Sequence, residues 1–287
     1  MATESLNFYK DGFFGYGEKG DFTYFSFWHF LPIVLLIAAI ILTYIFRDKI
    51  KEWKNEKYIR YTLAFIMMIV EMSYYWRLIY CGSQGKYTDL LTYFPVQVCT
   101  WSAILTVFLL TTETKWIFDH CVFVCLTLGL VPLATPAVIV STGPLYYRYY
   151  QFFLEHLIPI YAVFYMMFIK GFKYNIKTVW KPVLILTIGA FLAIALNSNI
   201  EGANYFYLGT STDGASLANI MPENPFLRLL IYFGVVVFAF AVEFGVFFLI
   251  DYLRKKKNNN VETVESVWFN FFYTFLHFSL YTFLHLL

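Results

Sequence analysis

The chain has 287 residues, of which 60% are hydrophobic and 22% aromatic, while only 14% are charged. A soluble domain usually carries about a quarter charged residues, so this deficit indicates that lipid is the main solvent of the chain. The formal net charge of +2 and the lack of a basic face interleaved with aromatic residues argue against nucleic acid as a partner.

The N-terminal segment, residues 1–27, is polar and glycine-rich for most of its length. It lacks the charged, apolar and small-residue zones of a cleavable signal peptide, so we expect the first membrane helix to direct insertion. Two further regions are predicted after it. Residues 28–253 form a transmembrane domain, and residues 254–287 form a basic cytoplasmic segment with an aromatic hydrophobic tail.

Seven segments are apolar enough, and at roughly 20 residues long enough, to cross a bilayer as helices. Each gap between them holds charges, glycine, proline or asparagine, and none is long enough for a soluble domain. The sequence therefore predicts an all-α fold, a polytopic bundle of transmembrane helices. The predicted spans are 28–46, 59–80, 91–111, 116–140, 149–169, 181–199 and 226–253.

Basic residues predict the direction of these spans. The first gap, the fifth gap and the segment after the seventh span are rich in Lys and Arg, whereas each even-numbered gap holds at most one. Because loops rich in Lys and Arg stay on the cytoplasmic side, the N-terminus is predicted outside and the C-terminus inside. We expect a multi-pass protein of the cell membrane. The sequence predicts no oligomeric state.

The tail repeats Tyr-Thr-Phe-Leu-His at 273–277 and 281–285. It is long enough for an eighth membrane helix. An aromatic helix lying in the membrane interface explains it equally well. Both interpretations stay open.

Polar side chains interrupt the predicted spans, and each ionisable one costs about 2.5–3.5 kcal/mol on insertion. At about 1.5 Å per residue, Cys99 lies about eight residues, roughly 12 Å, below the outer end of its span. On the same scale His156 lies roughly 10 Å deep and Glu71 roughly 14 Å deep, while His29 and Asn197 lie at the outer rim. We therefore expect one polar pocket in the outer half of the bilayer.

A thiol and an imidazole at matching depth favour nucleophilic catalysis, because His156 can take the proton of Cys99. Glu71 or Glu155 would hold the imidazole ring. Glu155 is the less suitable of the two, since it lies about 100° round the helix from His156. Gln97 lies on a different face from Cys99 and would reach the cavity as an amide donor to a developing oxyanion.

Structural roles are the alternative for each of these residues. A membrane cysteine is usually a packing residue, Glu71 can belong to an ion pair between helices, and His29 can be an anchor at the interface. Cys121 and Cys125 stand beside a histidine, but no further ligand accompanies them. Neither a metal nor a cofactor is predicted.

Five short motifs occur in order along the chain, and together they resemble the YwaF family of integral membrane proteins. That family is related to the transmembrane protein 164 acyltransferases. The similarity covers about residues 25–253 and includes seven spans. The motifs read FSFWHFL at 25–31, EMSYYW at 71–76, FPVQVC at 94–99, QFFLEH at 151–156 and NYFYL at 204–208.

The resemblance implies an acyltransferase that acts on membrane phospholipids and lysophospholipids. It implies Cys99 as the acyl-carrying nucleophile and His156 as its base, with Asn204 in the loop motif as part of the supporting pocket. Two positions depart from the family pattern: Gln97 replaces a histidine, and Glu155 stands where relatives tend to have a small residue.

Two other functions remain open. With water as the acyl acceptor, the same site would be a lipid-ester hydrolase. The rival from another class is a transporter or small-solute binding protein, in which Glu71, His156 and Glu243 line a proton or cation path. No inverted repeat between the two halves of the chain supports it, although many transporter folds have one.

Overall fold

The structure is a computed structural model that describes residues 12–15, 22–82, 94–136, 143–209, 222 and 224–257. These ranges contain helices and turns but no strand. The chain forms two units, Met1–Phe240 and Ala241–Leu287. The repeated pentapeptide of the tail lies outside the described residues, so both predictions for its placement stay open.

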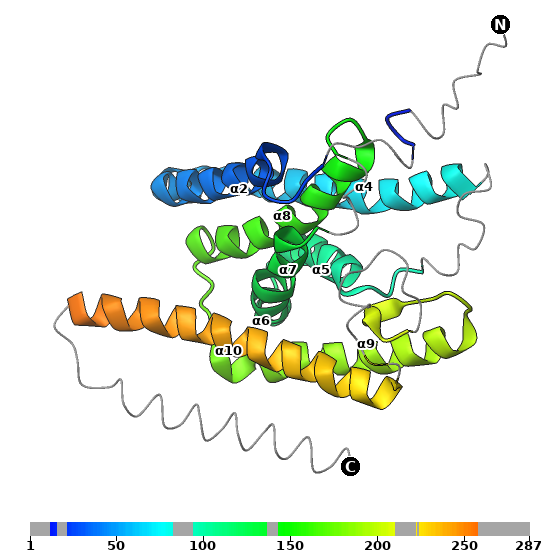
Figure 1. The fold of residues 1–287 in the computed structure, drawn as a ribbon. Helices are drawn as coiled ribbons and strands as arrows, with labels where there is room; N and C mark the ends of the chain where they lie inside the picture. Colours follow the sequence, from blue (N-terminus) through cyan, green and yellow to red (C-terminus); the bar gives the residue numbers. More distant parts are fainter. Residues whose placement is uncertain are drawn as a thin grey trace, which may run out of the picture. The chain divides into compact units, whose positions relative to one another are not determined.

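In the described part of the chain, six helices are long and apolar enough to cross a membrane, and Lys115–Ala134, which contains α6 and α7, counts as one of them. A seventh apolar helix, Val98–Thr112, is shorter. This confirms the prediction of an all-α, polytopic membrane bundle (Figure 1). A short helix, α3, follows the first of them. The helices are α2 (Phe27–Ile45), α3 (Arg47–Glu52), α4 (Glu56–Gly82), α5 (Val98–Thr112), α6 (Lys115–Phe123), α7 (Leu130–Ala134), α8 (Tyr147–Phe168), α9 (Trp180–Asn199) and α10 (Pro225–Lys257).

The third predicted span begins later than its hydropathy indicated. Helix α5 starts at Val98 instead of 91. Residues 95–97 form a turn and Gln97 has an extended backbone, with φ −64° and ψ 150°. Pro95 disfavours helix in the residue before it, which explains why the helix starts only after this turn. Cys99 therefore lies in the first turn of α5, and the prediction that it lies about eight residues inside a helix is wrong.

The fourth predicted span is broken by a π-helical turn, Val124–Leu128, between α6 and α7. Gly129 N–H donates to the Val124 carbonyl at 3.0 Å, which is the wider i→i+5 pattern. A Cβ at Gly129 would lie 2.3 Å from the Cys125 carbonyl oxygen, so only glycine fits there. The irregular turn lies just before Pro132, whose ring disfavours a regular helix on that side.

Helix α8 is the centre of the larger unit, because it packs against α2, α4 and α5 (Figure 1). The core between these helices is apolar: Met67 and Val70 of α4, Ala103 of α5 and Ile158 of α8 form one buried cluster. Polar residues on the inward faces of α4, α5 and α8 are consequently surrounded by protein and not by lipid.

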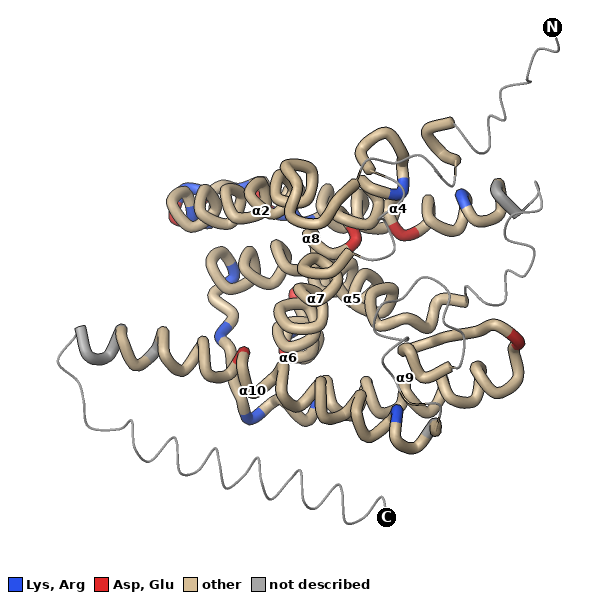
Figure 2. Tube along the Cα trace, viewed as in Figure 1, with Lys and Arg blue, Asp and Glu red and all other residues tan. Residues whose placement is uncertain are grey.

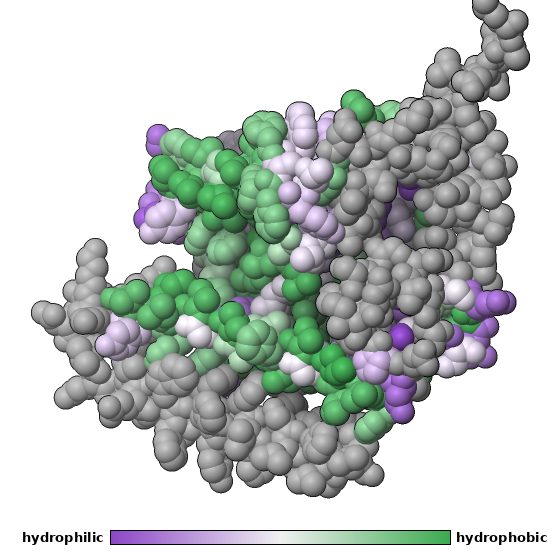
Figure 3. Space-filling model, viewed as in Figure 1, coloured by the Kyte–Doolittle hydropathy of each residue, from purple (hydrophilic) through white to green (hydrophobic). Residues whose placement is uncertain are grey.

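Other helices carry the surface that faces lipid. Helices α2 and α10 are hydrophobic over most of the surface seen in Figure 3. Soluble proteins rarely expose apolar surface of this extent, so these faces fit the acyl chains of a bilayer. Exposed side chains include Val34, Leu35, Ile37 and Ile41 on α2, Leu184 and Ile188 on α9, and Ile231, Val235 and Phe238 on α10.

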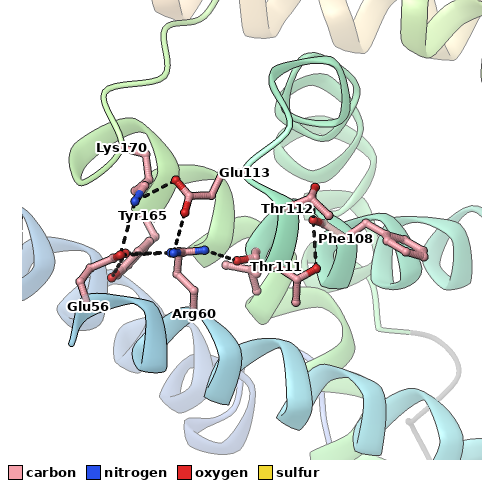
Figure 4. A network of polar contacts seen from close by, with 9 residues as sticks. Glu56, Arg60, Phe108, Thr111, Thr112, Glu113, Tyr165 and Lys170 are labelled. Carbon is pink, nitrogen blue, oxygen red and sulfur yellow. Dashed lines mark hydrogen bonds and ion pairs between the residues drawn. The ribbon is translucent and has the colours of Figure 1, made fainter. Parts of the chain in front are cut away.

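Loops that were predicted to share one membrane side meet in the structure. At the end that we call the Arg60 end, Arg60 lies 3.0 Å from Glu56 Oε1 and 2.6 Å from Glu113 Oε1. Lys170 Nζ lies 2.8 Å from Glu113 Oε2, and the Tyr165 hydroxyl donates to Glu56 at 2.8 Å. These residues come from the first, third and fifth gaps or the helix ends beside them, and their charges balance (Figure 4).

The described parts of the fourth and sixth gaps lie at the opposite end, which we call the Cys99 end. Tyr147 N–H donates to the Phe13 carbonyl at 2.7 Å, which joins the fourth gap to the N-terminal segment. Gln97 bonds the loop after α9. This alternation of loops agrees with the predicted order of spans. Which end faces the cytoplasm stays a prediction from the Lys and Arg distribution.

Candidate functional site

Three helices bring polar side chains together near the Cys99 end. Cys99 of α5 lies close enough to the Glu155 carboxylate of α8 and the Glu71 carboxylate of α4 for both to act electrostatically on its thiol. Glu71 and Glu155 in turn act on each other. In Figure 2, acidic positions interrupt the otherwise uncharged middle parts of α4 and α8. We call this group of three side chains the Cys99 pocket.

Glu155 is held by its own helix. Gln151 Nε2 donates to Glu155 Oε2 at 2.8 Å, and Arg148 donates to Gln151 Oε1. The guanidinium of Arg148 also lies 3.8 Å from Glu155 Oε2 and 4.8 Å from the centre of the Tyr74 ring on α4. Sequence reasoning missed Arg148 and Gln151, although polar residues at i, i+3 and i+7 mark one face of a helix.

Glu71 is the member of the pocket that the protein leaves unsatisfied. Its side chain is buried, and neither carboxylate oxygen has a hydrogen-bond partner in the described part of the chain. The hydroxyls of Thr100 and Tyr75 are polar neighbours, but neither completes a hydrogen bond with good geometry. A buried polar group without a partner is unfavourable and is most often found where a ligand or a proton is handled.

His156 has one nitrogen fixed and one free. Its Nδ1 lies 2.7 Å from the Phe152 carbonyl and must donate, because a carbonyl only accepts. Among the described residues its Nε2 has no partner, so this atom keeps the lone pair that a general base needs. Glu155 is the carboxylate that acts on the ring. No hydrogen bond joins His156 to Cys99 within the ranges that the structure describes.

The family model of the TMEM164 family matches residues 24–244, which is most of the chain and includes the Cys99 pocket. The chain belongs to the TMEM164 family. This confirms the relation to that family, while the YwaF name and the acyltransferase activity stay predictions. No curated protein and no solved structure matched the chain.

His29 of this TMEM164 family member lies apart from the Cys99 pocket. Its Nδ1 accepts from Phe25 N–H at 3.0 Å and its Nε2 donates to the Leu133 carbonyl at 2.7 Å. The ring packs among aromatic rings that include Phe22 and Phe153. With both nitrogen atoms bonded, His29 ties the start of α2 to α7. It also explains the left-handed backbone of Phe25, whose φ is 61°.

Gln97 and Asn204, both predicted in the supporting pocket, lie together. Gln97 Nε2 donates to the Asn204 carbonyl at 3.3 Å, and Gln97 Oε1 accepts from Phe206 N–H at 3.1 Å. Asn204 Oδ1 accepts from Gly209 N–H at 3.0 Å. Both ends of the Gln97 amide therefore bond the backbone of the loop after α9, and its role as an oxyanion donor stays a prediction.

The segment Ala203–Gly209, which we call the outer loop, is fixed against three helices. Asn197 of α9 bonds both sides of the Tyr205 backbone, at 2.8 and 3.0 Å. The Tyr205 hydroxyl accepts from Phe94 N–H at 2.7 Å, just before α5. Phe206 lies in the left-handed region, with φ 56°. That conformation is unfavourable for an aromatic residue and is usual where surrounding contacts impose it.

The outer loop reaches the Cys99 pocket through Tyr207, whose phenol is within electrostatic reach of Cys99 and Arg148. Tyr207 also has a left-handed backbone, with φ 57°. Sequence reasoning noted the Asn-Tyr-x-Tyr-Leu motif but assigned the tyrosines no role. A left-handed aromatic residue gives no signal in a single sequence, since glycine or asparagine is the usual choice there.

Two cysteines of the fourth predicted span do not join the pocket. Cys121 and Cys125 are buried free cysteines at the break between α6 and α7. Within the described ranges no group of three or more His, Cys, Asp or Glu side chains is placed to hold a metal ion. Glu243, named in the transporter hypothesis, belongs to the second unit.

Proposed function

We propose that this TMEM164 family protein transfers acyl groups between membrane phospholipids and lysophospholipids through Cys99. The placement of Cys99 carries the proposal: it lies in the first turn of a helix whose N-cap residue, Gln97, makes no side-chain cap. First-turn N–H groups have no partner within the helix, and they favour negative charge. They therefore suit both a thiolate and the oxyanion of an acyl-transfer intermediate.

The first chemical step transfers the acyl group to the protein. The Cys99 sulfur attacks the carbonyl carbon of a phospholipid ester, the C–O bond to glycerol breaks, and an acyl thioester forms. His156 Nε2 takes the thiol proton and returns it to the glycerol oxygen that leaves. The Glu155 carboxylate lies near the thiol and would orient the S–H group in the resting protein.

The second step releases the acyl group to an acceptor. His156 takes the proton of a lysophospholipid hydroxyl, the oxygen attacks the thioester carbon, and the C–S bond breaks. The thiolate is then protonated and the cycle closes without a cofactor. Water in place of the hydroxyl would make the same site a hydrolase, so exclusion of water decides between the two reactions.

Purified protein in lipid vesicles tests this proposal with a phospholipid labelled on one acyl chain and an unlabelled lysophospholipid. We expect Cys99→Ala to abolish label transfer and His156→Gln to slow it by about 10²–10⁴-fold. Glu155→Gln separates the role of Glu155 from that of the base. Loss of a residue that only orients the thiol should slow label transfer less than loss of the proton acceptor, His156. Unchanged transfer in Cys99→Ala would refute the proposal.

Matched controls are present in the same chain. Cys125→Ala removes a free cysteine outside the pocket, and His29→Gln removes a histidine whose nitrogens both make structural bonds. Cys125→Ala is expected to keep the transfer rate. His29→Gln is expected to lower thermal stability, because it leaves the Leu133 carbonyl without its donor.

A proton-coupled transporter is the second candidate, and the unsatisfied Glu71 carboxylate favours it. Buried carboxylates in membrane helices commonly carry protons. Proton uptake into protein-containing vesicles that is lost in Glu71→Gln but kept in Cys99→Ala would support transport over acyl transfer. The opposite pattern, with loss in Cys99→Ala alone, would support the enzyme.

A further inference from the structure

A buried arginine at the start of α10 has no anionic partner among the described residues. Arg228 is only 3% exposed. Its Nε donates to the Pro222 carbonyl, but its NH1 nitrogen is buried without a hydrogen-bond partner among the described residues. A buried charge that is not neutralised costs several kcal/mol. The missing group is therefore an anion with oxygen acceptors.

Two other arginines, by contrast, have a carboxylate partner. Arg60 lies 2.6 Å from Glu113 Oε1 and Arg148 lies 3.8 Å from Glu155 Oε2. Across the described residues Arg228 makes no such ion pair, and its side chain bonds only a backbone carbonyl. Arg60 and Arg148 are thus neutralised by carboxylates, whereas no carboxylate of the described residues pairs with Arg228.

A second unpaired donor lies one turn further along α10. The hydroxyl of Tyr232 is buried and has no partner in the described ranges. Residues four apart lie on the same face of a helix, so Arg228 and Tyr232 face the same side. A guanidinium and a hydroxyl together suit a phosphate group, because arginine binds phosphate oxygens through paired N–H donors.

Ring contacts connect this face of α10 to the Cys99 pocket. The Tyr232 ring lies 5.8 Å from the Phe206 ring of the outer loop, and Phe206 lies 5.9 Å from Trp101. Trp101 follows Cys99 by two residues on α5. Tyr207, the next loop residue, is within electrostatic reach of Cys99. The outer loop thus contacts the ring of Tyr232 on α10 and Trp101 near the thiol on α5.

The position along α10 also fits a phospholipid. Arg228 stands at the beginning of the helix, at the Cys99 end, where a head group would lie. Below it α10 exposes Ile231, Val235 and Phe238, and its surface in Figure 3 is hydrophobic. A lipid with its phosphate at Arg228 would lay its acyl chains along this apolar face.

We propose that Arg228 and Tyr232 form the subsite that binds the phosphate group of the phospholipid substrate. The identity of this lipid as a substrate rests on the proposed acyl transfer, whereas the binding of its phosphate does not. The subsite would hold the glycerol phosphate while the ester extends past the outer loop toward Cys99.

Binding is measured in the full-length Cys99→Ala protein, so that no chemistry takes place. The probe is dihexanoylphosphatidylcholine, which is added stepwise to the protein while its tryptophan fluorescence is recorded. Loss of a charge-assisted hydrogen bond predicts that Arg228→Gln weakens binding about tenfold or more, and Tyr232→Phe about threefold to tenfold. Dihexanoylglycerol, which lacks the phosphate, should bind all three proteins alike. Equal affinity of the three proteins for the phospholipid would overturn the subsite.

Stability separates a binding arginine from a structural one. Because Arg228 makes no ion pair with any described residue, Arg228→Gln should keep or raise the thermal midpoint of the lipid-free protein. Arg228→Lys keeps the charge and should retain part of the affinity. A large loss of stability in both variants would mean that Arg228 has a structural role, which contradicts the proposal. Arg47→Gln, a partly exposed arginine at the Arg60 end, is the matched control.

Competition with inorganic phosphate tests whether the subsite binds the phosphate group of a lipid or free phosphate. We expect it to compete only at concentrations far above those of the phospholipid, because it gains nothing from the apolar face. If it binds as tightly as the phospholipid, and in a manner that depends on Arg228, the site is one for free phosphate and the lipid assignment is wrong. Arg228-dependent lipid binding in a protein without acyl transfer would leave the subsite standing and refute only the proposed reaction.

Discussion

Three histidines show how hydrogen bonds assign roles that residue type alone cannot. His29 uses both ring nitrogens for backbone groups and is structural. His156 uses only Nδ1 and keeps Nε2 free. His120 is buried with its Nδ1 unpaired, yet it lies beside packed cysteines and not in the Cys99 pocket. Sequence reasoning grouped His29 with His156 by depth, because depth follows from position along a span whereas hydrogen bonding depends on neighbouring helices.

Glu155 is the residue at which sequence and structure differ most. Helical geometry made it the poorer partner for His156, since the two lie about 100° apart. In the structure Glu155 acts electrostatically on both the Cys99 thiol and the His156 ring, with Gln151 and Arg148 supporting it from one face of α8. The preference of a side chain for one partner depends on which helix packs beside it, and helix packing is not encoded in the pattern of a single span.

Gln97 offers a test at this scale, because its amide makes two hydrogen bonds to the outer loop. Gln97→Ala removes both, at about 1 kcal/mol each. We expect faster amide hydrogen exchange in residues 203–209 and earlier proteolysis of that segment. Ser198→Ala, which affects one exposed bond on α9, is the control. If the outer loop exchanges at the same rate in Gln97→Ala and in the parent protein, the two Gln97 hydrogen bonds do not hold the loop.

At the scale of elements, apolar length predicted the helices well and irregular turns poorly. A membrane helix is required to satisfy its backbone hydrogen bonds internally, so a run of apolar residues leaves few alternatives. The late start of α5 and the π-helical turn before α7 depend on Pro95, Gly129 and local packing, which change hydropathy little. The start of α5 matters most, because it places Cys99 in a helix first turn.

Gly129→Ala tests the irregular turn. Its Cβ would lie 2.3 Å from a backbone carbonyl oxygen, and backbone cannot move aside as a flexible side chain does. We expect a lower thermal midpoint in detergent. Gly234→Ala on α10 is the matched control, because a Cβ there meets nothing within 4 Å and alanine favours helix by about 1 kcal/mol. If the two variants have the same thermal midpoint, the steric account of Gly129 is incorrect.

At the scale of the whole molecule, the two ends of the larger unit use charge differently. The Arg60 end balances Arg60 and Lys170 against Glu56 and Glu113, and every one of these ions has a partner. Within the part of the chain that the structure describes, the Cys99 end has an unsatisfied carboxylate at Glu71 and, in α10, an arginine without an ion pair, Arg228. Satisfied networks stabilise a bundle, whereas unsatisfied buried groups are expected where a ligand binds.

Composition and charge predicted this overall arrangement but not the contrast between the ends. The alternation of basic loops predicted the order of spans, and the structure groups the loops accordingly. Which carboxylates are paired depends on side chains contributed by helices far apart in the sequence. For the same reason, Arg228 gave no signal before the structure: a single arginine near a helix start is ordinary in a membrane protein.

Detection of an acyl thioester on Cys99 tests the central claim most directly. Purified protein is incubated with a phospholipid carrying an alkyne-tagged acyl chain, without an acceptor, and its peptides are examined by mass spectrometry. We predict a tagged acyl group on Cys99 that neutral hydroxylamine removes, that a lysophospholipid discharges, and that is missing in Cys99→Ala. Acyl transfer at the normal rate with Cys99 never acylated, or with the acyl group on another residue, would contradict the account.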